Sequence, residues 1–217
     1  MKKLTQITIA LLFTILSAYA QDSPYQAAMK KEIAKLMDAD SLPVYQQSAN
    51  AFARISQLNP NEWQPYYYEA LACTFQGVDI HLPADKRDEV LARATEIAEK
   101  ADAISKNNSE IVALQGFITM AKLSVDPAGR GQSLSAQVMQ TFGKALAINE
   151  KNPRALVLLA QMEHGMAKFF GSGTEKSCGL AYESLASFAT QDEAALKAAL
   201  MPTWGKNLAE KMVKSCQ

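Results

Sequence analysis

Apolar residues recur at every third or fourth position along most of the chain after Tyr25. In the segment 89–104 they form one stripe opposite the charged residues, made up of Val90, Leu91, Ala94, Ile97, Ala98, Ala101 and Ile104. The segment 27–37 has the same spacing in Ile33, Leu36 and Met37. This periodicity is typical of amphipathic helices. Alternating strand patterns and Asn-Gly or Asp-Gly hairpin turns do not occur, so the sequence predicts an all-α fold.

An internal repeat organises these helices. The stretches 101–116 and 145–160 align without gaps at an offset of 44 residues, and a fainter copy at 55–70 precedes the middle one by 46. Each copy consists of the end of one helix, a polar turn and the start of another helix. A helical hairpin cannot bury its apolar face alone, so stacked antiparallel hairpins in a short right-handed solenoid are expected.

The turns and small residues of the repeat support this architecture. Pro60 and Pro153 are expected near helix starts, where proline forfeits no helical hydrogen bond. Ser109 also lies near an expected start and is followed by an acidic residue, which suits a first helical turn. At one register every copy has a small residue that would let two helices approach closely, namely Ala70, Gly116 and Ala160.

This pattern resembles the tetratricopeptide repeat family over residues 45–170. The matching residues are Phe52, Pro60, Ala101, Ala103, Asn108, Ala145, Ala147 and Pro153. The spacing exceeds the family's repeat of about 34 residues. We expect the excess in loops, at 76–88, 124–133 and 164–175.

A narrower resemblance is to exported tetratricopeptide-like proteins of Bacteroidota. It rests on four short segments: Val125-Asp126-Pro127, Gly129-Arg130-Gly131, Phe169-Phe170-Gly171-Ser172-Gly173 and Trp204-Gly205. The third segment is also similar to a loop of the periplasmic helical-repeat protein that accompanies some TRAP transporters. There a second glycine is expected where Ser172 stands.

The N-terminus has the features of a secretory signal peptide. Lys2 and Lys3 precede an apolar stretch at 7–16, and Ala18-Tyr19-Ala20 provides a cleavage site. We therefore expect a signal peptide at 1–20 and a single helical-repeat domain at 21–217, in a periplasmic or secreted protein. The alternative is an uncleaved anchor. No later segment reaches the roughly 20 apolar residues that span a bilayer, so no integral membrane segment is expected after cleavage.

Charge and motifs argue against several function classes. The chain has 22 basic and 22 acidic residues, and this balance disfavours a nucleic-acid partner. His81 and His164 lack the spacing of a metal motif, and the segment 171–177 lacks the glycine of a phosphate-binding loop. No nucleophile motif is present. The sequence therefore predicts a protein that is not an enzyme and has neither a cofactor nor a metal site.

Three cysteines follow the signal peptide: Cys73, Cys178 and Cys216. Helices at about 174–190 and 203–215, joined by a short segment, would pack antiparallel and bring Cys178 level with Cys216. We expect a disulfide between these two in an oxidising compartment. The alternative is that the last residues fray and all three thiols stay free. Cys73 lies in an apolar helix and is expected to be a buried thiol.

The candidate partner-binding residues are Trp63, Tyr67, Tyr68 and Arg130. With Tyr66, the three aromatic residues cover every face of one helix, so those that project outward would serve as anchors. The alternative is that all of them pack between hairpins. The Arg130 guanidinium suits a carboxylate or phosphate ligand, or an internal ion pair that supports its loop.

Together these features predict an exported helical-repeat module that binds an envelope protein or peptide through the groove of its stacked hairpins. The alternative is a small-solute-binding or transporter-accessory protein, with a pocket bounded by the long loops.

Overall fold

The computed structural model describes residues 22–216, so the predicted signal peptide lies outside the described residues. Within this range the chain forms ten α-helices and no strand, and the predicted all-α fold is confirmed. The helices are α2 (Pro24–Met37), α3 (Leu42–Leu58), α4 (Trp63–Val78), α5 (Ala84–Ile104), α6 (Ser109–Val125), α7 (Pro127–Ile148), α8 (Pro153–Phe170), α9 (Glu175–Ala189), α10 (Glu193–Ala198) and α11 (Lys206–Lys214).

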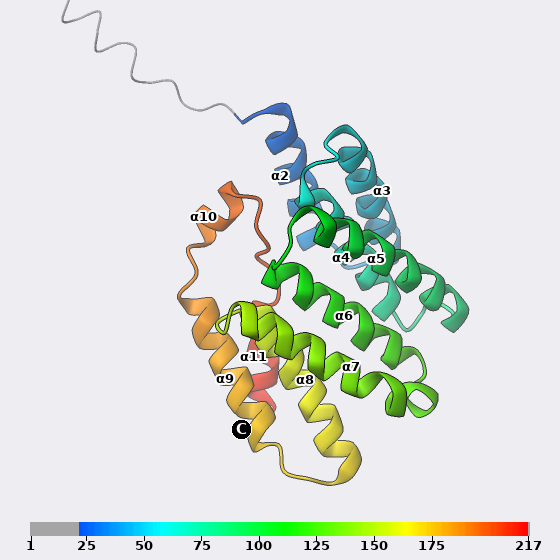
Figure 1. Ribbon diagram of the computed structural model, residues 1–217, viewed down its shortest axis with the longest axis vertical. Helices are drawn as coiled ribbons and strands as arrows, with labels where there is room; N and C mark the ends of the chain where they lie inside the picture. The colour runs from blue at the N-terminus through cyan, green and yellow to red at the C-terminus, as the bar shows by residue number, and fades with distance from the viewer. Residues whose placement is uncertain (1–21, 217) are drawn as a thin grey trace, which may run out of the picture.

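The helices stack in chain order (Figure 1). From α2 to α9 each helix packs against the next, and α4, α6 and α8 also contact one another in a row. These three helices are the second halves of the three sequence repeats, so the repeat is also the unit of stacking. After α9 the chain turns back, and α11 packs against α8 and α9.

Local sequence explains where the helices begin. Asn108 and Asn152 occupy the same position in their repeats, and each side chain accepts hydrogen bonds from backbone N–H groups of the first helical turn. α8 begins at Pro153 and α6 at Ser109, as expected. The expectation for Pro60 was wrong: Pro60 lies in the turn before α4, which begins three residues later at Trp63.

The extra length of each repeat lies in the helices and not in the loops. α5 has 21 residues and α7 has 22. Only residues 79–83 separate α4 from α5, residues 171–174 separate α8 from α9, and Asp126 alone separates α6 from α7. Asp126 ends one helix and caps the next, since its side chain accepts a hydrogen bond from the Gly129 N–H at 3.0 Å. The long loops expected from the sequence are therefore absent from these parts of the chain.

The small residue of the middle repeat has the predicted role. A Cβ atom at Gly116 would lie 2.5 Å from the Phe142 ring, which is closer than atoms can pack. Ala70 and Ala160, at the same register, are fully buried. Small side chains at this register therefore let α6 and α7 approach closely, and keep the neighbouring repeats tightly packed.

A disulfide closes the C-terminal part of the fold. Cys178, near the start of α9, is bonded to Cys216, just after α11, with their Cα atoms 5.8 Å apart. This is the pairing that the sequence predicts. The joining segment is longer than a simple turn, because it contains α10, and α11 begins at Lys206 and not near Thr203. Cys73 is a free, buried thiol.

Among residues 22–216, no helix is both long and apolar enough to cross a membrane.

We expect the double variant Cys178→Ser/Cys216→Ser to unfold with a free energy about 3–4 kcal/mol lower than that of the wild type. The bridge joins positions 38 residues apart, and this restricts the unfolded chain. Guanidinium denaturation of the chain from residue 21 to residue 217 measures the difference. An unchanged midpoint would contradict the prediction.

Thiol alkylation provides the companion measurement. Burial raises the pKa of the Cys73 thiol to about 12, so at pH 8 only about one molecule in ten thousand carries the reactive thiolate. Without reductant we expect no labelling of the folded protein, and one labelled cysteine after denaturation. Three labelled cysteines under those conditions would show that the bridge is not formed.

Candidate binding pocket at the C-terminal turn

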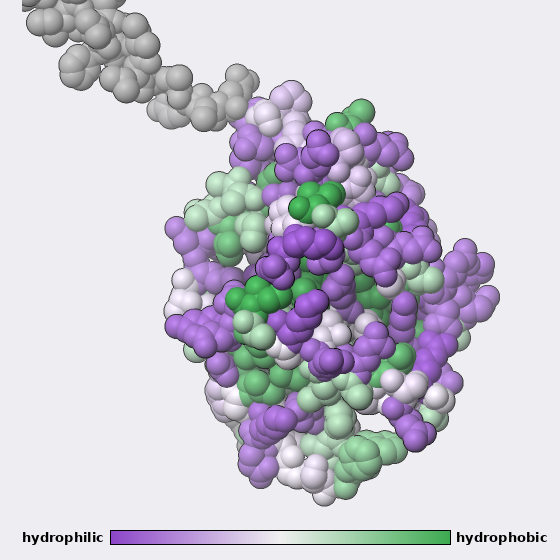
Figure 2. Space-filling view, viewed as in Figure 1, coloured by the Kyte–Doolittle hydropathy of each residue, from purple (hydrophilic) through white to green (hydrophobic). Residues whose placement is uncertain are grey.

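A pocket of about 840 Å³ lies between α2 and the segment 193–208. This segment comprises α10, the connection that follows it and the first turn of α11. Figure 2 shows the surface opened beside α10, on the left of the molecule. The apolar part of the wall includes Met37, Tyr45, Phe75, Met201, Trp204 and Leu208. The pocket therefore combines aromatic rings with two thioether side chains, which adapt to irregular ligands.

One wall of the pocket stands away from the core. α10 has six residues and none of them is buried. The connection after it returns to the core at Leu200, whose side chain is buried. The backbone of Leu200 has a φ of 57°, in the left-handed region. The Tyr68 hydroxyl donates a hydrogen bond to the Leu200 carbonyl, with an oxygen–oxygen distance of 3.4 Å. α10 is therefore held mainly by the segments on either side of it.

Trp204 forms the aromatic floor of the pocket. Its ring is stacked on Phe117 at a centroid distance of 5.7 Å and meets the edge of Phe75 at 6.2 Å. Phe75 in turn lies 5.5 Å from Tyr45. These rings come from α3, α4, α6 and the segment before α11, so the floor exists only when all four are assembled.

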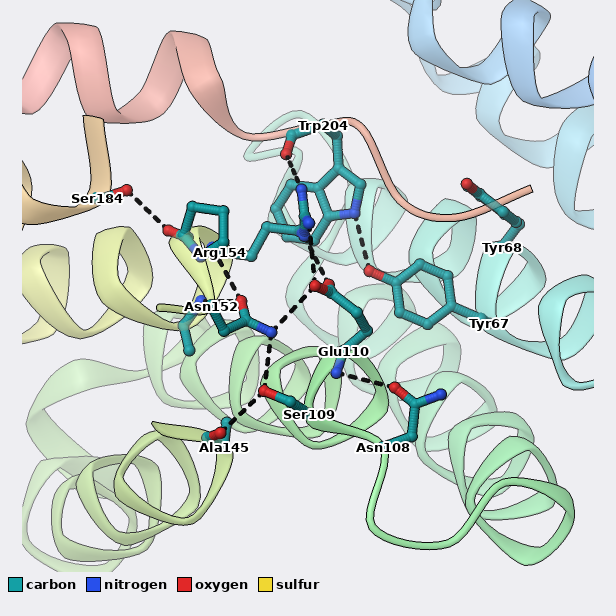
Figure 3. Close-up of polar contacts among 12 residues, drawn as sticks. Tyr67, Tyr68, Asn108, Ser109, Glu110, Ala145, Asn152, Arg154, Ser184 and Trp204 are labelled. Carbon is teal, nitrogen blue, oxygen red and sulfur yellow. Dashed lines mark hydrogen bonds and ion pairs between the residues drawn. The ribbon is translucent and has the colours of Figure 1, made fainter. Parts of the chain in front are cut away.

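Two hydrogen bonds fix the position of Trp204 (Figure 3). The indole N–H donates to the Tyr67 hydroxyl at 2.9 Å, and the Arg154 guanidinium donates to the Trp204 carbonyl at 3.1 Å. Gly205 follows with a φ of 104°, where a Cβ would lie 3.2 Å from Phe188 and 3.3 Å from Arg154. A glycine is required here both by the backbone conformation and by the close approach.

Arg154 is the centre of a buried polar network. Its Nε and Nη2 donate to the two carboxylate oxygens of Glu110 at 2.6 and 2.9 Å, and Asn152 donates to the same carboxylate at 3.0 Å. The Arg154 side chain is 1% exposed. Burial by itself would lower the pKa of Arg154, but the charge and hydrogen bonds of Glu110 outweigh this and raise it. Arg154 therefore keeps its charge inside the protein, and its hydrogen bonds join α6, α8 and the Trp204 segment.

Lysines gather at the rim of the pocket. Lys30 of α2, Lys197 of α10 and Lys206 of α11 line it, together with the carboxylates of Asp38 and Glu193. The lining therefore carries one more positive than negative side chain.

The partner-binding residues predicted from the sequence have different environments in the structure. Tyr67 and Tyr68 are fully buried, so their prediction as outward anchors was wrong and the alternative of packing between helices holds for both. The reason is that α4 lies inside the stack, with neighbours on several sides. Trp63 is partly buried, with its ring edge-on to Tyr67 at 5.7 Å. None of the three lines the pocket.

Arg130 has the alternative role of an internal ion pair. Its two terminal nitrogens each lie 2.6 Å from a carboxylate oxygen of Asp88, and one also donates to the Lys122 carbonyl. Hydrogen bonding from Arg130 lowers the pKa of Asp88. The pair joins the start of α7 to α5 and leaves little of the guanidinium for a ligand.

Sequence reasoning missed the residues that build the pocket. One signal was present for the network that supports it: Glu110 and Arg154 occupy the same register in successive repeats and have opposite charges. Helices at equivalent positions stack, so such a pair is placed to meet. No comparable signal connected residues 30–45 with residues 193–208.

We expect Arg154→Met to lower the free energy of unfolding by about 3–5 kcal/mol, because it leaves the Glu110 carboxylate buried without its cation. The double variant Glu110→Leu/Arg154→Met should recover much of this loss, since an apolar pair has no charge to desolvate. Lys106→Met, in an exposed pair with Asp102, is the control and should change stability by less than about 1 kcal/mol. Denaturant unfolding measures all three, and equal effects of Arg154→Met and Lys106→Met would contradict the prediction.

Comparison with known proteins gives a match among solved structures. No family model and no curated protein matches the chain, so membership of the tetratricopeptide repeat family stays a prediction. Among solved structures, the chain is similar to the HusA haemophore from Porphyromonas gingivalis, with a TM-score of 0.78 and 27% sequence identity. The match covers 91% of this chain and 94% of that one. Along almost its whole length, this all-helical chain is thus similar in fold to a haemophore of a Bacteroidota species.

Proposed function

We propose that this chain is an exported, non-enzymatic binding protein that holds haem, or a similar tetrapyrrole, in the pocket between α2 and the segment 193–208. The observation that carries the proposal is the pocket itself: a volume of about 840 Å³, aromatic and methionine walls and a lysine rim. The similarity to a haemophore supports the same ligand class. The small-solute function considered from the sequence thereby takes precedence over the protein-partner function.

The pocket suits a flat apolar ring in size and chemistry. Ligand pockets commonly measure about 300–1,000 Å³ and are lined mainly by apolar and aromatic side chains. Tyr45 and Phe75 are partly exposed and offer ring surfaces for stacking beside the mostly buried Trp204, and Met37 and Met201 complete the apolar lining. A tetrapyrrole is a large aromatic plane with carboxylates on one side, so its plane matches the wall and its acids match the lysines.

The side chains available to the haem iron are the thioethers of Met37 and Met201. Methionine sulfur is an established haem ligand. Tyr45 is less suitable, because burial raises the pKa of its phenol and its hydroxyl donates to the Ala39 carbonyl at 3.1 Å. Neither His81, on the exposed turn after α4, nor His164, on α8, lines the pocket.

The protein-partner function is a second proposal with its own observation. Phe169 and Phe170, at the end of α8, are 83% and 71% exposed. α8 ends at Phe170, and the α8–α9 turn that follows lies at the opposite end of the molecule from α2 (Figure 1). Two adjacent exposed aromatic residues are typical of a protein contact, and this contact would leave the pocket free.

We expect the mature protein to bind haemin at one molecule per chain, with a shift of the Soret absorption band. Ala34→Trp, an exposed position of α2 that lines the pocket, should weaken binding at least about tenfold, because the indole occupies the ligand's space. Ala27→Trp is the matched control: it is also exposed on α2, but it does not line the pocket. Spectrophotometric titration measures the affinities.

Wild-type affinity in Ala27→Trp and loss in Ala34→Trp would place the ligand in this pocket. Equal affinity of both variants and the wild type would mean that haemin binds elsewhere, and the proposed site would be abandoned. Circular dichroism and the unfolding midpoint of each variant show that the fold is retained.

A further inference from the structure

The lysines at the rim are incompletely neutralised. Lys30 is paired with Asp22, with Nζ and Oδ1 2.5 Å apart. Lys197 is paired with Glu193, which lies one turn earlier in α10, at 2.6 Å. Lys206 has no ion-pair partner among residues 22–216. It lies close enough to Glu193 to lower the pKa of that carboxyl, in addition to the larger effect of Lys197. Lys197 and Lys206, on different helices, therefore both line the pocket with Glu193, which forms an ion pair with Lys197 alone.

The Lys197–Glu193 pair is easily exchanged. Both side chains are more than 60% exposed, and an exposed pair within one helix contributes little to stability. A ligand carboxylate held at the pocket mouth is partly shielded from water, and its attraction to the two lysines is correspondingly stronger than that of an exposed side chain. Glu193 would then compete with the ligand for the same cations.

We propose that Lys197 and Lys206 together bind a carboxylate of the ligand, so that the pocket selects porphyrins with free acid groups and Glu193 weakens their binding. This inference rests on the proposed function, because it assigns the acid-binding side of the same pocket. The contact is a charge-assisted hydrogen bond from each ammonium group to the carboxylate. A neutral ester has no negative charge to attract either lysine, and it accepts only a weaker hydrogen bond.

The test compares haemin with haemin dimethyl ester on the mature protein. We expect the ester to bind about tenfold more weakly than the acid. Lys197→Gln and Lys206→Gln should each weaken haemin binding about three- to tenfold, the range of a partly exposed charge-assisted contact. In the double variant, the acid and the ester should bind equally well. Lys211→Gln, an exposed position of α11 outside the pocket, is the matched control and should leave the affinity unchanged.

Glu193→Gln distinguishes competition between Glu193 and the ligand from a merely structural role of this residue. Removing the competing carboxylate should tighten haemin binding about two- to fivefold, the range of an exposed charge interaction, and leave the affinity for the ester unchanged. Raising the salt concentration should weaken binding of the acid by wild type but not binding of the ester.

The outcomes distinguish this inference from the proposed function. Equal binding of acid and ester by the wild type overturns the inference, and so does unchanged haemin affinity in the double lysine variant. In both cases haemin still binds, so the proposed function stands. Failure of haemin to bind the wild type overturns both proposals.

Discussion

The buried ion pair between Arg154 and Glu110 is the interaction on which the assembly of this molecule depends. A guanidinium that is 1% exposed is stable only if its charge and hydrogen-bond donors are satisfied within the protein. The Glu110 carboxylate and the Trp204 carbonyl satisfy them. The guanidinium also lies over the Phe188 ring, with its Cζ 5.6 Å from the ring centroid. These partners come from α6, α9 and the segment before α11. Satisfying the charge and the hydrogen-bond donors of Arg154 therefore fixes how the last repeat packs against the C-terminal segment.

The same network determines the shape of the pocket. The Trp204 carbonyl accepts a hydrogen bond from Arg154, and its indole N–H donates one to the Tyr67 hydroxyl. These bonds hold the ring against Phe75 and Phe117. The aromatic floor is therefore preorganised. The opposite side differs, because α10 has no buried residue. A fixed floor and a weakly held wall suit the proposed site, which would admit a large planar ligand.

The disulfide and Leu200 hold the chain on either side of α10. Cys178–Cys216 fixes α11 against α9, while the buried Leu200 returns the chain to the core beside Tyr68. α10 lies between α9 and Leu200. It lines the pocket with Lys197 and has no residue in the core. The fold thus places α10, the helix without a buried residue, beside the pocket.

The sequence by itself determined what depends on neighbours along the chain: helical periodicity, the repeat, the helix starts at Ser109 and Pro153, the close approach at Gly116 and the pairing of Cys178 with Cys216. It failed where the answer depends on packing. Tyr67 and Tyr68 were candidates for partner binding, with packing between hairpins as the alternative, and only the stacking of α4 between its neighbours shows that they are buried. Likewise, residues 30–45 and 193–208 form one pocket because α11 folds back on α8 and α9, and no local pattern records a contact between segments so far apart.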